Sequence, residues 1–300
     1  MKNSYLFSML ICLSTVTYQV QAQTSSFENN KWSGFFDQEK FNQNFEDKTA
    51  ALLQNEKFIS PKDAASKLLA VEGQKINLNK PKTRTKALKS AEVASIIQPS
   101  FVAFGVAYDC GNCHRAHINA ASGYIISEDG LIVTNYHVIE GYTNESGNKN
   151  LAMTVQGIDG EVYLVNEVVS SYRAADLAIV KVDTKGKKLK ALPLGNTANV
   201  GDDVFVISNP APMINYFSVG KVARNYLGYF NSKVKLPQTD ITADYAAGSS
   251  GAPIVDQYGN LVCTVSATRS IYYNPKEQKN LQMVAKNTIP VVLLKELIAN

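Results

Sequence analysis

A long succession of short strand-type segments constrains this chain more than any other feature, because it restricts most of the chain to an all-β fold. From Phe101 onward, apolar runs alternate with turn sequences such as Glu128-Asp129-Gly130. Short strands at this spacing, with little helix between them, are typical of barrels and sandwiches. The predicted strands are 101–108, 123–126, 131–135, 151–155, 162–169, 177–182, 203–207, 217–223, 240–242, 252–255 and 261–267.

Helices are predicted only before and after this β region. Ser60 is suited to cap a helix with Pro61 in its first turn, and the apolar stripe of that helix ends before Gly73. A second short helix is predicted over Ser90–Ile97, and the Leu/Val-rich tail Ile289–Ile298 predicts a closing helix. The closing helix follows the last predicted strand.

The segment 23–90 differs from the rest in being rich in Asn, Gln and Lys, with weak periodicity. Its basic stretch from Lys75 to Lys89 predicts a solvated linker, because it lacks the interleaved aromatic residues or known module of a nucleic-acid site. We therefore expect no nucleic-acid partner. The whole segment is expected to be an extension that is dispensable for activity.

The first residues have the pattern of an export signal. Lys2 provides a positive start, Tyr5–Leu13 is an apolar run, and Val20-Gln21-Ala22 is a small-x-small cleavage sequence. An uncleaved anchor is the alternative, but the apolar run is short for a bilayer span. The sequence predicts a signal peptide over 1–22 and a periplasmic or secreted protein with no stable membrane anchor after cleavage.

Three side chains in the chain order His, Asp, Ser fit nucleophilic catalysis. Ser250 lies in the glycine-rich turn 248–253, His137 follows a predicted strand, and Asp176 directly precedes one, where a carboxylate needs a partner. His137 is the candidate base, and Asp176 is the candidate group that orients it. The backbone N–H groups of Gly248 and Ser250 are the candidate oxyanion donors.

Five stretches that occur in the same order resemble the HtrA-type branch of the trypsin-like serine proteases. They are 122–138, 176–182, 192–210, 218–222 and 248–253. The resemblance covers about residues 95–292. It implies two six-stranded antiparallel β-barrels, about 96–190 and 191–288, within a protease domain over 91–300, with His137 and Asp176 from the first barrel and Ser250 from the second.

Two departures from the family pattern affect regulation. The sequence ends at Asn300, so we expect no PDZ domain after the protease domain. Ser249 stands where trypsin-like zymogens carry the Asp that receives a new N-terminus, so activation by an inserted N-terminus is not expected. Oligomeric state stays open.

Substrate-binding residues are predicted at two places. Asp244 lies six residues before the nucleophile, at the position of the pocket base in trypsin-like enzymes, and predicts a preference for Lys or Arg, whereas HtrA-type pockets take small aliphatic residues. Ser266, Ala267 and Thr268 are predicted to bind an extended substrate as an added strand.

Cys110, Cys113 and His117 form a separate cluster in the loop after the first strand. With Cys263 as a further ligand they could hold a structural zinc ion. The string from Cys110 through His114 also matches a haem-attachment pattern, and a local disulfide is the third alternative. None of these groups is required for proteolysis, so no cofactor is expected for the reaction.

The sequence thus predicts an exported serine endopeptidase that acts on protein or peptide substrates through an acyl-enzyme. The alternative is a non-catalytic pseudoprotease that captures extended peptides and is gated by metal at the Cys/His loop.

Overall fold

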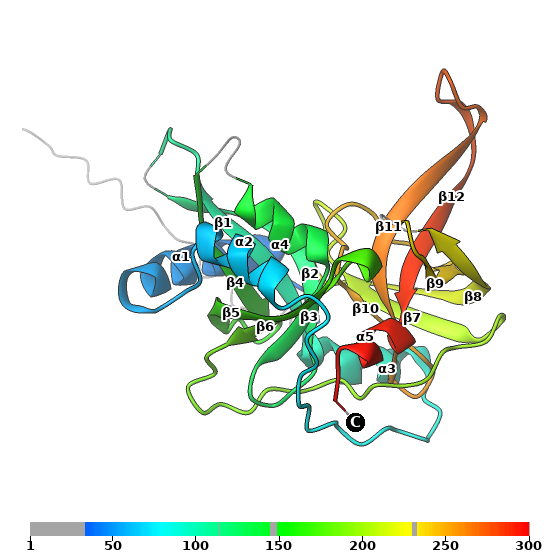
Figure 1. The fold of residues 1–300 in the computed structure, drawn as a ribbon, viewed down its shortest axis with the longest axis horizontal. Coiled ribbons are helices and arrows are strands. Elements are labelled where there is room, and N and C mark those ends of the chain that lie inside the picture. Colours follow the sequence, from blue (N-terminus) through cyan, green and yellow to red (C-terminus); the bar gives the residue numbers. More distant parts are fainter. Residues whose placement is uncertain (1–33, 114, 145–148, 230–232, 300) are drawn as a thin grey trace, which may run out of the picture. The chain divides into compact units, whose positions relative to one another are not determined.

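Two closed six-stranded antiparallel barrels stand side by side in the computed structural model (Figure 1). The structure describes residues 34–113, 115–144, 149–229 and 233–299; the predicted signal peptide lies outside them. The first barrel has the order β1-β2-β3-β6-β5-β4 and the second β10-β11-β12-β9-β8-β7. This confirms the predicted fold class.

The strand bounds are β1 Phe101–Asp109, β2 Ala116–Ile125, β3 Leu131–Thr134, β4 Lys149–Gly157, β5 Val162–Tyr172, β6 Leu177–Val182, β7 Asp203–Ser208, β8 Tyr216–Tyr229, β9 Lys235–Ile241, β10 Pro253–Val255, β11 Leu261–Asn274 and β12 Lys279–Pro290. The helices are α1 Gln38–Asn55, α2 Pro61–Ala70, α3 Ser90–Ile97, α4 Tyr136–Thr143 and α5 Val291–Glu296, with 3-10 turns η1 Gln98–Ser100 and η2 Arg173–Ala175. None of the helices in the described ranges is long and apolar enough to cross a bilayer.

Apolar side chains fill each barrel and also the space between the barrels. Phe104 and Val180 lie in the interior cluster of the first barrel, and Val206 and Ile254 in that of the second. A third cluster joins both barrels to α3 and α5; it includes Ile97, Tyr124, Leu177, Ile207 and Leu294. The two barrels are therefore held together by buried apolar surface.

Three elements, α1, α4 and β12, were missed by the sequence patterns. β12 was not predicted because its first half is exposed and mixes polar with apolar residues, so only its pairing with β11 shows it to be a strand. The tail helix accordingly starts at Val291 rather than at Ile289. α4 was not predicted either, because Gly141 and β-branched residues give it weak helix propensity.

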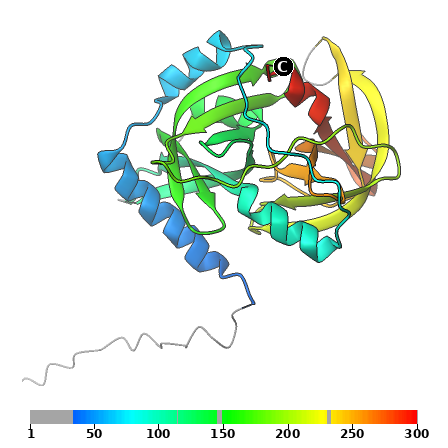
Figure 2. The same ribbon diagram turned by 90° about the horizontal axis from the view of Figure 1, so that it is seen from below.

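The expected boundary at residue 90 is not a structural boundary, because one compact unit begins at Gln38. Figure 2 shows α1 lying along the first barrel. Phe45 of α1 is only 3% exposed, and its ring lies against the β1 backbone at Gly105, where a side chain would clash with it. The predicted extension is thus partly integral to the protease domain from α1 onward.

In the rest of this segment, α2 packs on the first barrel, whereas the basic stretch after it is mostly exposed. α2 has the predicted start, since Ser60 Oγ accepts a hydrogen bond of 3.1 Å from the Asp63 amide. Its Leu68 belongs to the core of the first barrel, and the Ser171 hydroxyl donates to the Leu68 carbonyl at 2.7 Å. The basic stretch that follows is mostly exposed, as predicted, but Ile76 exchanges backbone hydrogen bonds with Leu297 and Ala299 beside α5.

Two neighbouring leucines of α2 test whether this helix is integral to the fold. Leu68 is 3% exposed and Leu69 is 66% exposed. We expect Leu68→Ala to lower the free energy of unfolding by about 2–5 kcal/mol, because it leaves a cavity in the core. The matched Leu69→Ala should change it by less than about 0.5 kcal/mol. Chemical denaturation measures both; equal, negligible effects would show that α2 is a detachable extension.

Candidate active site

The pairing of β3 with β6 brings the candidate base and its acidic partner together. Thr134 at the end of β3 pairs with Ala178 of β6, and α4 starts immediately after β3, so His137 lies in the first helical turn. His137 Nδ1 lies 2.9 Å from Asp176 Oδ2 and 3.0 Å from Oδ1. The His137 backbone amide also donates to Oδ1 at 3.0 Å. His137 and Asp176 therefore form the predicted pair, in which the Asp176 carboxylate contacts both the ring and the backbone amide of His137.

Asp176 is buried, at 3% exposure, and its carboxylate is well satisfied. Besides the two groups of His137, the Ser266 hydroxyl donates to Oδ2 at 3.2 Å. The residue has a left-handed backbone, with φ of 56°, and its carbonyl accepts hydrogen bonds from the Tyr136 amide and the Asn135 side chain. Since a buried carboxylate is costly without such donors, this arrangement fits a fixed negative charge behind the imidazole.

The environment shifts the pKa of His137 in two opposite directions. Partial burial of the ring lowers the pKa, whereas the hydrogen bond and the charge of Asp176 raise it; the net pKa lies above its ordinary value of 6.5. Glu140 adds a smaller upward effect. The ring is still 44% exposed, so its other nitrogen, Nε2, is accessible from the cleft side.

The turn that carries Ser250 requires glycine at both ends. Gly248 and Gly251 have φ values of 91° and 84°, which other residues rarely adopt. A Cβ at Gly251 would lie 2.4 Å from the Ser122 carbonyl oxygen and 2.5 Å from Thr134 Oγ1, and one at Gly248 would lie 2.4 Å from the Asn209 carbonyl oxygen. The turn is thus pressed against the end of β3, three residues before His137.

Ser122 of β2 holds this turn from the opposite barrel. Its amide donates to the Ser250 carbonyl at 3.0 Å, and its hydroxyl donates to the Gly248 carbonyl at 3.0 Å. The same hydroxyl accepts a hydrogen bond from the Asn209 amide. Ser122 begins the stretch 122–138 that resembles the family, but the sequence does not predict this role, because the role depends on the packing of the two barrels.

Ser250 itself is half-buried and available for chemistry. Within the described ranges, no hydrogen bond joins Ser250 Oγ to the His137 ring, and the amides of Gly248 and Ser250 donate to no carbonyl. A loose contact between nucleophile and base is common before substrate binds. Ser249 is fully buried and its hydroxyl donates to Ser208 Oγ, so this position forms an uncharged contact.

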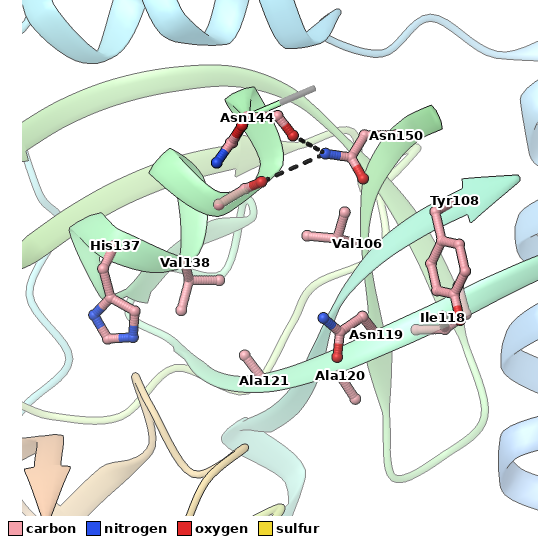
Figure 3. Close-up of a pocket in the computed structure, with 11 residues that line it drawn as sticks. Val106, Tyr108, Ile118, Asn119, Ala120, Ala121, His137, Val138, Asn144 and Asn150 are labelled. Carbon is pink, nitrogen blue, oxygen red and sulfur yellow. Dashed lines mark hydrogen bonds between the residues drawn. The ribbon is translucent and has the colours of Figure 1, made fainter. Parts of the chain in front are cut away.

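A cleft of about 480 Å³ opens beside His137 (Figure 3). The wall formed by β1 and β2 contributes Tyr108 and residues 118–121, while His137 and Val138 come from α4. Ser250 is not among the residues that line this cleft. The cleft therefore lies on the first-barrel side of His137.

The predicted substrate-binding residues fall into two groups. Pairing between β10 and β11 stops at Thr264, while β12 covers the other edge of β11, so Ser266, Ala267 and Thr268 keep one edge without a strand neighbour in the described chain. Asp244 differs from expectation: its side chain is 80% exposed and lies 3.5 Å from the Lys286 ammonium. It therefore does not form the base of a buried pocket.

The Cys/His cluster also assembles. Cys110 Sγ lies 3.4 Å from Cys113 Sγ, which lies 3.1 Å from His117 Nε2, and all three residues meet within 4.8 Å. Hydrogen bonds from the Asn112 amide and the Cys113 thiol lower the pKa of Cys110 to about 7. Cys263 does not join them, because it is buried in the second barrel, where burial raises its pKa to about 11. His114 of the haem pattern lies outside the described residues.

Comparisons with known proteins show similarity to serine proteases. The family described as "Trypsin-like peptidase domain" matches residues 121–263. Serine protease HTRA1 of Xenopus laevis is 33% identical over 177 residues, which cover 56% of this chain and 36% of that protein. Putative serine protease HhoA of Synechocystis is 29% identical over 174 residues, 56% of this chain and 41% of its own length.

Solved structures show the same fold. The HtrA-type protease AlgW with a tripeptide matches 70% of this chain and 62% of its own, with a TM-score of 0.54 and 22% identity. Deg5 matches 68% of this chain and 90% of its own, with a TM-score of 0.52 and 23% identity. The chain spans well under two thirds of the length of the curated relatives, 36% and 41% of the two above. The matched domain over residues 121–263, the HtrA relatives and the two-barrel fold together make this chain similar to the trypsin-like serine proteases of the HtrA type.

Proposed function

We propose that this protein is a serine endopeptidase that uses Ser250, His137 and Asp176. The observation that carries the proposal is the buried Asp176 carboxylate, which holds both the ring and the backbone of His137 next to the Gly251 turn. A merely structural aspartate would not need to fix the orientation of an accessible imidazole. The same three residues occur in the chain order and on the barrels that the family pattern implies.

The chemistry follows from this arrangement. Ser250 Oγ adds to the peptide carbonyl carbon while His137 Nε2 accepts its proton. When the C–N bond breaks, His137 returns the proton to the leaving amine, and Ser250 keeps the acyl group as an ester. A water molecule then attacks the ester carbonyl while His137 Nε2 accepts its proton. The ester bond breaks, His137 returns the proton to Ser250 Oγ, and the carboxylic acid product is released. Asp176 keeps Nδ1 protonated and stabilises the imidazolium, but is not itself protonated.

Two further features support the proposal. The amides of Gly248 and Ser250 make no backbone hydrogen bond among the described residues, so they are available for the oxyanion. The open edge of Ser266, Ala267 and Thr268 can bind an extended peptide through backbone hydrogen bonds. Substrates of this kind are proteins or peptides.

We also propose that the protein is exported to the periplasm or the medium. The support is the pattern of residues 1–22, with its apolar run and small-x-small cleavage sequence. N-terminal sequencing of the mature protein should start at Gln23. Retention of residues 1–22 on a membrane-bound form would contradict it.

Replacement of the nucleophile tests the proposed reaction. We expect Ser250→Ala to reduce kcat/KM for peptide cleavage by about 10⁴- to 10⁶-fold, because the acyl-enzyme can no longer form. A fluorophosphonate probe should label the wild type at Ser250 and leave the variant unlabelled. Ser95→Ala, at an exposed serine of α3, is the control and should keep full labelling. An unlabelled wild type that still binds peptides would establish the pseudoprotease alternative.

The pH dependence tests the role of Asp176. Catalysis needs neutral His137, so kcat/KM should fall as the pH decreases through the raised pKa of His137. Asp176→Asn removes the groups that raise this pKa and leaves the burial that lowers it, so the acid limb should move to lower pH. The maximal rate should also fall, by about 10⁴-fold.

A carboxylate of the same neighbourhood serves as the control for this pH experiment. Glu140 is 51% exposed and contributes only the smallest upward effect on the pKa of His137. Glu140→Gln should therefore shift the acid limb far less than Asp176→Asn and keep the maximal rate. Equal shifts for the two variants would show that Asp176 has no special role.

The position of Asp244 leads to an expectation about specificity. Because its carboxylate is 80% exposed and faces Lys286, we expect Asp244→Asn to change the ratio of cleavage after Lys or Arg to cleavage after Val by less than about two-fold. Profiling with a peptide library measures this ratio. A selective loss of cleavage after Lys and Arg would restore the trypsin-like preference that the sequence position predicted.

A further inference from the structure

We propose that Cys110, Cys113 and His117 form a zinc site that joins the β1–β2 hairpin to α1. The proposal concerns metal binding and does not depend on the peptidase reaction. Both cysteines are free thiols in the structure. Two thiolates and an imidazole are the ligand types that zinc prefers.

The distances between the ligand atoms fit one tetrahedral ion. Ligands bound to a tetrahedral zinc ion lie roughly 3.5–3.8 Å from each other, given the usual Zn–S and Zn–N bond lengths. The Cys110 and Cys113 sulfurs are 3.4 Å apart, and Cys113 Sγ is 3.1 Å from His117 Nε2. Small movements of these side chains, of which Cys113 is exposed and the other two are partly buried, would bring the atoms to the bonded geometry. A water molecule can serve as the fourth ligand.

The backbone of the hairpin gathers these ligands before any metal binds. Asp109 Oδ1 accepts a hydrogen bond of 2.8 Å from the Gly111 amide, which closes a tight turn at the end of β1. Gly111 has φ of 70°, a conformation that glycine adopts readily. The turn places Cys110 and Cys113 on the same side, and the β1–β2 register places His117 opposite Tyr108. The site is therefore largely formed by local structure.

A carboxylate from α1 supports the histidine from behind. His117 Nδ1 lies 3.6 Å from Glu46 Oε1, while Nε2 faces the sulfurs. Metal-binding histidines commonly present their second ring nitrogen to a carboxylate in this way, which fixes the ring and strengthens the ligand. The Tyr108 ring packs against the His117 ring, with centroids 5.6 Å apart. This second layer distinguishes the cluster from a chance meeting of exposed thiols.

The location gives the site a structural consequence. Tyr108, which packs on His117, also lines the cleft beside His137 (Figure 3). A bound ion would therefore fix the wall of that cleft and hold it to α1 through Glu46. Bound zinc should stabilise the β1–β2 hairpin against local unfolding. Hydrogen exchange of the hairpin amides measures this effect without any peptidase activity.

The experiment uses the full chain with Ser250→Ala, reduced and freed of metal, so that self-cleavage does not intervene. We expect one zinc ion per chain by plasma mass spectrometry after dialysis. Cobalt as a replacement ion should produce the charge-transfer absorption of thiolate ligands and the spectrum of a tetrahedral site. Zinc should also protect Cys110 and Cys113 from alkylation and slow hydrogen exchange in the hairpin.

Matched variants separate ligands from neighbours. Cys110→Ser and Cys113→Ser should abolish the thiolate-to-cobalt absorption and the alkylation protection, and Cys263→Ala should keep both. Glu46→Gln should weaken zinc affinity by about ten-fold, while Asp47→Asn, at the exposed next residue, should leave it unchanged. Circular dichroism of each variant checks that it is folded.

Three results would overturn the proposal. One is zinc binding that survives Cys113→Ser in a folded variant. Another is a Cys110–Cys113 disulfide in the purified protein whose reduction yields no metal binding. The third is covalently attached haem, seen as added mass and visible absorption. Because binding is measured without turnover, failure here leaves the proposed peptidase function untouched, and an inactive enzyme leaves the zinc site untouched.

Discussion

The site depends on one set of hydrogen bonds across the two barrels, those that Ser122 of β2 makes with the nucleophile turn. Its amide and hydroxyl hold the carbonyls of Ser250 and Gly248, and its hydroxyl accepts from Asn209. These bonds place the serine of one barrel against the end of the strand that leads to the histidine of the other. Without the apolar cluster between the barrels, the turn that carries Ser250 could not keep this position against the end of β3. The position of the Ser250 turn relative to His137 is therefore a product of the packing between the two barrels.

A single buried charge organises the other half of the site. The Asp176 carboxylate is surrounded by three donor groups from two parts of the chain: the ring and amide of His137 and the hydroxyl of Ser266. Ser266 begins the segment that we propose as the substrate-binding strand, and its hydroxyl donates to the Asp176 carboxylate. One hydrogen bond therefore joins this strand to the carboxylate that contacts His137.

The segment before the barrels adds support from outside the cleft. α1 and α2 bury Phe45 and Leu68 on the first barrel, and Glu46 faces the Cys/His cluster at the tip of the hairpin. The wall of the cleft is thus fixed on one side by α4 and on the other by elements that precede the barrels. The packing of α1 and α2 on the first barrel was not predicted from this polar segment, because only a few residues of each helix are buried.

The sequence by itself determined the strand-rich fold class and the α2 and α3 helices, and it predicted His137, Asp176 and Ser250 as candidate catalytic residues, since these follow from local periodicity, caps and short motifs. It also predicted that Cys110, Cys113 and His117 lie close together, although His117 lies on β2 and not in the loop. Only the tertiary structure decided that Ser122 and Ser266 hold the site, that Asp244 faces Lys286, and that β12 is a strand. The physical reason is that these contacts join residues far apart in the chain, and their hydrogen bonds and ion pairs leave no pattern in the local sequence.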